Sequence, residues 1–391
     1  MQENNEVTTG IRRNVLLIYR TMIPSIRLCG HSQLEALAEE GLVSYRAVAE
    51  TKIKKQDMEW ADVVILGRTD SWYECRLADA LFKAGRKLLY ILDDDLLNIP
   101  PEISSAAYYG QKDTQMYIRG MIGMSDGILS PSPVLLGKYA VDGRKGYLIE
   151  EPAIDPVEYT ARDLDKTVRI GFAGSIDRTG DVERILKGAL LTIKRKYGDR
   201  VEFEFFGAIP SFAEQLGATC YEYTESYEEY RGVLNLLEWD IGLAPMPATK
   251  FHACKHYNKF VEYAAAGIAG IYSDVPPYSR LTEFQDCVIL CENSEQSWVD
   301  AISLLIDNPE GREMVRENAC RTAAGKLSVR ETANGVLEML ESLPQRSISG
   351  MPVKIPLFYC KAVNLWKRFV SACKSGSLKR RIKKLFRIGA E

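Results

Sequence analysis

The stretch KHYNKFVEYAAAGIAGIYSD, residues 255–274, is a polar helical pattern that runs through three alanines and Gly267 into a short apolar strand. On a helix over 253–266 the apolar side chains form one stripe, and a second stripe gathers two cations, an amide and a carboxylate. The second stripe consists of Lys255, Asn258, Lys259 and Glu262. Gly267 suits the left-handed residue that ends a helix. The stretch therefore predicts a helix–strand unit of an α/β fold with one polar helix face.

Apolar runs alternate with helical patterns along most of the chain. The first third contains strand-like runs at 14–20, 43–48, 61–67, 87–92 and 126–132, and the pattern restarts with runs at 167–174, 201–207, 240–245 and 287–291. Continuous apolar strands separated by helices predict parallel sheets that are covered on both faces. The segment 150–159 carries two prolines and is interpreted as a linker. The sequence predicts two consecutive doubly wound Rossmann-like domains, over 1–155 and 156–343, with the final helix of the second crossing back.

Composition excludes several classes of protein. The length of 391 residues exceeds what one hydrophobic core usually serves, which favours two domains. The longest apolar runs are too short to span a bilayer, and no signal-peptide run precedes the first strand. The nine cysteines are scattered without a CxxC motif, which is typical of reduced thiols. We expect a cytoplasmic protein.

The C-terminal segment, 344–391, differs in charge from the rest of the chain. Residues 342–390 contain 12 Lys and Arg and no Asp or Glu, and since the net charge of the whole chain is −3, the preceding body is acidic. The runs 355–376 and 377–389 place Trp, Phe and Leu among the basic residues. Basic amphipathic helices of this kind bind anionic membranes. We expect residues 355–389 to bind the inner face of the cell membrane and no nucleic acid, which the acidic body would repel. The alternative is a solvated tail, or a strap packed on the N-terminal domain.

The polar stripe at 255–262 has the chemistry of a nucleotide site. Lysine ammonium groups hold phosphates, and a carboxylate accepts two hydrogen bonds from a ribose diol. The alternative interpretation is a surface pair between Lys259 and Glu262, which would contribute about 0.2–0.5 kcal/mol.

A second stretch, GFAGSIDRTGD at 171–181, lies where a strand ends and a long helix begins. The small residues Gly174 and Ser175 leave backbone N–H groups and a helix dipole free for an anion, and Arg178 follows them. There is no GxGxxG or GxxxxGK[ST] motif, so a plain strand-to-helix loop is the alternative. The two stretches together predict a diphosphate cradle and a ribose clamp in one domain.

The order GFAGS, DIGLAPMP, NKFVEYAAAG and PPY resembles the C-terminal half of GT-B glycosyltransferases, close to retaining family 4. The segment KLLYILDDDLLNIP at 87–100 is similar to an N-terminal segment of bacterial surface-polysaccharide members. The resemblance covers roughly residues 12–343. It implies that the donor nucleotide sugar binds the second domain, with Lys255 or Lys259 on the diphosphate and Glu262 on the ribose. Cys254 stands where many members carry a second glutamate, and Arg178 substitutes for a family lysine.

The first domain carries candidates for the acceptor side. Asp93, Asp94 and Asp95 follow the strand at 87–92, and clustered carboxylates raise one another's pKa, which suits a base or a metal site. We expect Asp93 or Asp94 to position the acceptor hydroxyl; a solvated strand end is the alternative. The loop at 19–31 is expected to line the acceptor side, or else to be an ordinary basic surface loop. Its candidates are Arg20, Arg27 and His31.

A zinc site at His252, Cys254 and His256 is the less favoured interpretation, because HExxH and paired cysteines are absent. We expect no metal and no cofactor beyond the nucleotide-diphosphate sugar that serves as the donor. The expected activity is transfer of a hexose to a hydroxyl of a glycan or lipid-linked acceptor in cell-surface polysaccharide synthesis, with retention implied by the resemblance. A GT-B-fold nucleotide-sugar epimerase and a non-catalytic sugar-nucleotide or glycan-binding protein remain alternatives.

Overall fold

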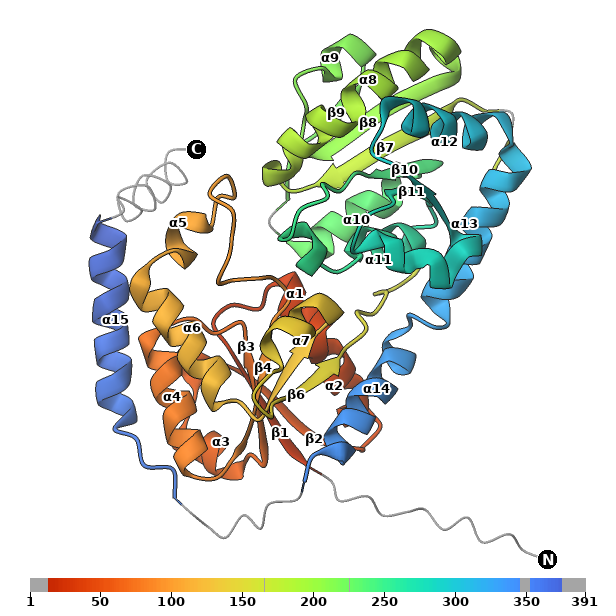
Figure 1. Cartoon of the computed structure of the whole chain (residues 1–391). Coiled ribbons are helices and arrows are strands. Elements are labelled where there is room, and N and C mark those ends of the chain that lie inside the picture. Colours follow the sequence, from red (N-terminus) through yellow and green to blue (C-terminus); the bar gives the residue numbers. More distant parts are fainter. Residues whose placement is uncertain (1–12, 165, 225, 345–351, 375–391) are drawn as a thin grey trace, which may run out of the picture.

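The computed structural model of the chain describes residues 13–164, 166–224, 226–344 and 352–374. It contains two six-stranded parallel sheets, each in its own domain (Figure 1). The first sheet has the order β2-β1-β3-β4-β5-β6. Its strands are β1 (Asn14–Tyr19), β2 (Ser44–Ala49), β3 (Val63–Gly67), β4 (Lys87–Ile91), β5 (Gly127–Ser130) and β6 (Lys145–Leu148).

Helices cover both faces of this sheet, as the uninterrupted apolar runs predict. Along β1, Leu16 and Ile18 pack into the cluster under α4 and α6, whereas Val15 and Leu17 face the other way, toward α2. The helices are α1 (Pro24–Ile26), α2 (Ser32–Glu39), α3 (Lys55–Trp60), α4 (Trp72–Lys83), α5 (Ala106–Tyr109), α6 (Lys112–Met124) and α7 (Pro133–Tyr139), with the short turns η1 (Arg27–His31) and η2 (Glu50–Lys52).

The second sheet has the order β12-β11-β10-β7-β8-β9. Its strands are β7 (Val168–Gly174), β8 (Val201–Gly207), β9 (Thr219–Tyr221), β10 (Ile241–Ala244), β11 (Ala269–Ser273) and β12 (Val288–Cys291). The helices around it are α8 (Thr179–Tyr197), α9 (Ala213–Leu216), α10 (Tyr227–Leu237), α11 (Asn258–Ala265), α12 (Glu295–Asp307) and α13 (Pro309–Ala324), with η3 (Ile176–Arg178), η4 (Gly198–Arg200), η5 (His252–Cys254) and η6 (Tyr278–Cys287).

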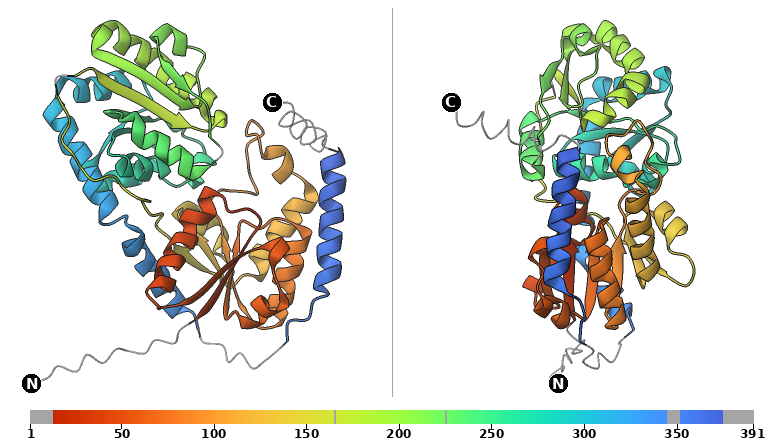
Figure 2. Two further views of the ribbon diagram at one scale, coloured as in Figure 1. Left: turned by 180° about the vertical axis from the view of Figure 1, so that it is seen from behind. Right: turned by 90° about the vertical axis from the view of Figure 1, so that its left-hand side faces the viewer.

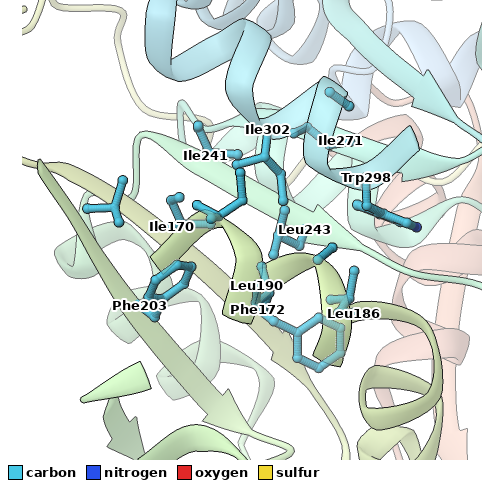
Figure 3. Close-up of a cluster of buried hydrophobic side chains, with 14 of the residues drawn as sticks. Ile170, Phe172, Leu186, Leu190, Phe203, Ile241, Leu243, Ile271, Trp298 and Ile302 are labelled. Carbon is cyan, nitrogen blue, oxygen red and sulfur yellow. The ribbon is translucent and has the colours of Figure 1, made fainter. Parts of the chain in front are cut away.

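Figure 3 shows the core between this sheet and two of its helices, with Leu186 and Leu190 of α8 and Ile302 of α12 over the strands. On the opposite face the indole of Trp239 lies directly against Gly171, where an added Cβ would come within 2.0 Å of Cδ2. Trp239 is fully buried, so a glycine at 171 is needed to admit it. These two faces confirm the prediction of a doubly wound second domain.

The chain connects the two domains twice. After β6 it crosses through a segment without helix at 150–159, and after α13 the helix α14 (Val329–Ser342) returns to the first domain (Figure 1). There Val336 and Leu340 pack with α2, and Arg13 donates a hydrogen bond to the carbonyl oxygen of Leu343 at 2.5 Å. The last helix of the globular body therefore belongs to the core of the first domain.

The helix predicted over 253–266 begins later than expected. Helix α11 begins at Asn258, and Lys255 precedes it in an extended conformation with φ −78° and ψ 168°. His256 turns into the interface between the domains, and its contacts there hold the backbone out of the helix. Lys255 therefore does not share a helix face with Lys259 and Glu262. Strands β6 and β9 were not predicted, because both are short and largely exposed and so form no apolar run.

The basic C-terminal segment begins as a helix, α15 (Leu357–Lys374), which lies along the outside of the first domain (Figure 2). Cys360 is buried in the cluster under α4, Lys367 lies over the ring of Trp72, and Arg368 pairs with the buried Glu50. This face matches the alternative of a strap packed on the N-terminal domain. The run predicted at 377–389 lies outside the described residues.

Candidate functional site

A cleft of about 240 Å³ lies between the two domains. The carboxyl ends of β4, β7 and β10 open into it, which is where doubly wound sheets bind ligands. The residues predicted for the donor side and for catalysis all line this cleft, although they come from three separate parts of the chain. They are Asp93, Asp94, Gly174, Ser175, Arg178, Lys255, Asn258, Lys259 and Glu262.

Gly174 is the last residue of β7, and Ser175 leads through a 3-10 turn into α8. The long helix α8 thus begins directly after three residues that line the cleft, so the positive end of its dipole lies beside the cleft. Arg178 is fixed beside this turn, since its Nη2 donates to the carbonyl oxygen of Pro245 at 2.5 Å and its Nη1 lies 3.5 Å from Asp181. The carboxyl end of β10 and the start of α8 are joined by this arginine.

Lys259 and Glu262 form the pair that the alternative interpretation predicted, with Nζ 2.5 Å from Oε2. The pair is not a surface pair, because only 19% and 12% of the two side chains are exposed. Tyr230 of α10 donates to the same Oε2 at 2.8 Å. The carboxylate and the ammonium therefore face the cleft in a fixed arrangement.

The three aspartates after β4 each have a cation of their own. Asp93 pairs with Arg68 at 2.6 Å, Asp94 pairs with Lys255 at 2.7 Å, and Asp95 pairs with Lys138 at 2.5 Å. Burial raises the pKa of Asp95, but hydrogen bonds from Asn98, Lys138 and Tyr139 lower it further, so the net shift is downward. The expectation that clustered carboxylates raise one another's pKa is wrong for Asp95, because its neighbours are donors.

The Lys255–Asp94 pair joins the two domains across the cleft. Lys255 comes from the second domain and Asp94 from the first, and both side chains are about three-quarters buried. This ion pair connects the two walls of the cleft through a direct contact between the Lys255 and Asp94 side chains.

A second group of charges lies at the base of the cleft, around the fully buried His256. Its Nε2 is 3.0 Å from Oε1 of Glu150, and its Nδ1 is 2.8 Å from Oδ1 of Asn258 and 3.3 Å from Oε2 of Glu151. Burial disfavours the charged imidazolium, but the two glutamates outweigh burial and raise the pKa of His256 to about 9. His256 and Glu151 line the cleft, although neither was predicted there: His256 was considered only as a zinc ligand, and Glu151 was not a candidate. No motif marks Glu151, which lies in the linker.

The acceptor-side candidates separate in the structure. Arg20 lines a second cavity, of about 420 Å³, in the first domain with Arg68, Asp70, Tyr108 and Tyr109. Its Nη1 donates to both Asp70 and Tyr108 at 2.8 Å. Because Arg68 also pairs with Asp93, this cavity adjoins the wall of the interdomain cleft.

Arg27 and His31 line neither cavity. Arg27 pairs with Glu228 of the second domain, and His31 lies 2.8 Å from the hydroxyl of Tyr45. Burial lowers the pKa of His31. The loop at 19–31 folds into α1 and the kinked turn η1, which direct these two side chains away from the cavities.

The described part of the chain contains no group of three or more His, Cys, Asp or Glu residues that could hold a metal ion. His252 pairs with Asp181, and the thiol of Cys254 is turned toward the carbonyl oxygen of Lys250, within the core of the first domain. The three residues of the zinc interpretation therefore point to three different places. Cys254 also lies outside the cleft lining.

Two doubly wound domains with a ligand cleft between the carboxyl ends of their sheets, and a last helix that crosses back, have the GT-B architecture. No protein-family model matches the chain, and no curated protein matches it.

Solved structures of other proteins share this architecture. HepE of Anabaena in complex with UDP and glucose is 13% identical, with 85% of this chain and 100% of that chain covered and a TM-score of 0.58. A glycosyltransferase of Rickettsia africae is 14% identical, with coverage of 84% and 98% and a TM-score of 0.55. The UDP-N-acetylglucosamine 2-epimerase of Neisseria meningitidis bound to its nucleotide sugar is 12% identical, with coverage of 84% and 99% and a TM-score of 0.50. At such identities the similarity shows the fold alone.

Proposed function

We propose that the chain is a glycosyltransferase that binds a nucleotide-diphosphate sugar in the interdomain cleft and transfers the sugar to a hydroxyl group. The observation that carries this proposal is that one cleft gathers a helix N-terminus, three cations and a nearly buried carboxylate on the second domain, opposite the aspartates of the first. HepE, which has the same fold, is described in complex with UDP and glucose, and this supports the assignment of the ligand.

In the donor site Glu262 accepts hydrogen bonds from the ribose diol, and Lys259, Lys255 and Arg178 lie at the diphosphate. Each of these cations is paired with a carboxylate of the protein, so diphosphate binding exchanges protein carboxylates for phosphate oxygens. The charge that develops on the leaving diphosphate is stabilised by these cations and by the dipole of α8, with no bound metal. Gly174, Ser175 and Asn258 bring backbone and amide donors to the same place.

The acceptor occupies the first domain. Its hydroxyl is positioned by Asp93 or Asp94, and its body lies in the cavity of Arg20, whose two tyrosine rings suit a pyranose. Closure of the two domains excludes water and limits hydrolysis of the donor. We propose that the configuration at the anomeric carbon is retained, as the resemblance to family 4 implies, and that the acceptor is a glycan or lipid-linked glycan of a cell-surface polysaccharide.

Helix α15 supports an acceptor at a membrane. Its outward face carries Phe358, Tyr359, Leu365, Trp366 and Phe369, which are 52–89% exposed and lie on one side of the helix. None of the described helices is long and apolar enough to cross a membrane. An exposed aromatic face on a basic helix suits the interface of an anionic bilayer. We propose that α15 places the protein at the inner surface of the cell membrane.

The membrane proposal is tested by vesicle flotation of wild type and the double variant Trp366→Ala, Phe369→Ala, with Leu236→Ala as an exposed apolar control on the second domain. Wild type and control should float with vesicles that contain phosphatidylglycerol and not with phosphatidylcholine alone, and the double variant should remain unbound. Equal flotation of all three proteins would exclude this face.

The epimerase alternative is favoured by the shared fold with the Neisseria 2-epimerase. An epimerase would convert a nucleotide sugar in the absence of any acceptor, whereas a transferase would release nucleotide only slowly. The third candidate is a binding protein, which would bind nucleotide without turnover. It is favoured by Cys254, which stands where many family 4 members carry a glutamate and does not line the cleft.

The decisive experiment is a thermal-shift panel of UDP, GDP, dTDP, CMP and ADP with wild type, Glu262→Ala and the exposed control Glu338→Ala. A ligand at 100 times its Kd stabilises the folded state by about 2.7 kcal/mol. One nucleotide should stabilise wild type and the control, and Glu262→Ala much less. Incubation of the matching nucleotide sugar without acceptor, followed by chromatography, then separates transferase from epimerase. No shift with any nucleotide would refute the donor site.

A further inference from the structure

Glu151 lies in the linker at 150–159, and only 2% of its surface is exposed. Yet it lines the interdomain cleft beside Asn258 and His256. A carboxylate in such a position needs hydrogen-bond donors, because burying an ionised group without partners costs free energy.

One oxygen of Glu151 has its donor within the protein. The thiol of Cys29 donates to Oε1 at 3.0 Å. Burial raises the pKa of this thiol, and the charges of Glu151 and Asp93 raise it further, so Cys29 stays protonated and remains a donor. Oε1 is therefore occupied.

The other oxygen, Oε2, accepts no hydrogen bond from the described residues. His256 is close, with Nδ1 at 3.3 Å, but both ring nitrogens have other partners. Nδ1 faces Oδ1 of Asn258 at 2.8 Å, and Nε2 faces Oε1 of Glu150 at 3.0 Å. His256 thus lies beside Oε2 as a charge partner, while its two ring nitrogens face Asn258 and Glu150.

The cations of the cleft do not satisfy Oε2 either. Lys255 pairs with Asp94, Lys259 pairs with Glu262, and Arg178 is held by Asp181 and a carbonyl oxygen. Oε2 is therefore open to a donor from a ligand in the cleft, and a hydroxyl group of that ligand would supply one.

We propose that Glu151 accepts a hydrogen bond from a hydroxyl of the sugar moiety of the nucleotide sugar, and that His256, whose Nδ1 lies 3.3 Å from Oε2, is the positioning residue that holds the Glu151 side chain in place. This inference rests on the proposed function. It names the part of the donor that Glu151 recognises: a hydroxyl-bearing sugar, as distinct from the nucleoside and the diphosphate, which Glu262 and the cations bind.

The test is isothermal titration calorimetry of UDP and UDP-glucose with wild type, Glu151→Gln and the control Glu158→Gln, which changes an exposed glutamate of the same linker. If the nucleotide panel selects guanine, the pair becomes GDP and GDP-mannose. Glu151→Gln should leave the Kd for the nucleotide within twofold and raise the Kd for the nucleotide sugar about tenfold, since a hydrogen bond to a charged group is lost. The control should bind both ligands as wild type does.

The role of His256 is read from a pH profile. The ratio of the Kd for UDP to the Kd for UDP-glucose in wild type should be constant from pH 6.5 to 8. It should fall as pH passes through 9, because a neutral His256 no longer holds the Glu151 side chain by charge. In His256→Asn this ratio should have no step near pH 9.

Equal losses of UDP and UDP-glucose in Glu151→Gln, or no loss of either, would overturn the contact. So would a wild type that binds UDP but gains no affinity from glucose, galactose or N-acetylglucosamine on it. A wild type that binds no nucleotide would overturn the proposed function itself, and this is visible before any variant is compared.

Discussion

The protonated His256 at the domain interface should make the stability of the protein fall with rising pH. The side chain is fully buried, and the carboxylates of Glu150 and Glu151 hold its proton, which raises its pKa from 6.5 to about 9. A group whose pKa is higher in the folded state than in the unfolded state stabilises the folded protein to its full extent at pH values below the unfolded pKa. That contribution is lost as pH rises through the folded pKa. The window is therefore pH 6.5 to 9.

The magnitude follows from the width of this window. At about 1.4 kcal/mol per pH unit, the interval between 6.5 and about 9 corresponds to about 3 kcal/mol of unfolding free energy. Glu150 acts outside the window: burial raises its pKa, but its hydrogen bond from His256 and the charge of His256 outweigh burial and lower it. The contribution of Glu150 is therefore lost only in acid, below its usual pKa.

The assay is urea unfolding of wild type and His256→Asn between pH 5.5 and 9.5, followed by tryptophan fluorescence. Glu74 also titrates within this pH range, because burial raises its pKa to about 7. It is present in both proteins, so its effect cancels in the difference between their free energies of unfolding. The free energy of unfolding of wild type should exceed that of the variant most at pH 6. This difference should shrink by about 3 kcal/mol by pH 9.5. A difference that does not change with pH would refute the charged state of His256.

Three further outcomes follow from single contacts. Gly171→Ala should destabilise the second domain by about 1–3 kcal/mol or more, because the added Cβ would meet Trp239 at 2.0 Å. The measurement is a lower Tm. Gly180→Ala is the control, because nothing lies within 4 Å of its added Cβ. Asp94→Asn should abolish most turnover at an unchanged circular-dichroism spectrum, and full turnover would exclude Asp94 from catalysis. Lys259→Ala should raise the Kd for the nucleotide about tenfold in calorimetry, and an unchanged Kd would remove this lysine from the diphosphate site.

The doubly wound fold could be predicted because the central strands are buried on both faces and therefore form continuous apolar runs. The runs at 14–20 and 167–174 each begin a sheet, and both became central strands. Short exposed strands such as β6, with the sequence KGYL, carry no such signal and were missed. The polar stripe of α11 also followed from local periodicity, apart from Lys255, whose backbone is extended.

The sequence by itself determined the elements, the two-domain order and the polar residues at the ends of β4, β7 and β10, since each of these depends on neighbours within a few residues. Only the tertiary structure decided which charges meet. Asp94 pairs with Lys255, and Glu151 contacts Cys29 and His256, although these partners are more than a hundred residues apart along the chain. Such pairs depend on how the two sheets face one another across the linker. Because the contacts of Glu151 and the raised pKa of His256 arise only where the two domains meet, their place in the site is a property of the assembled domains.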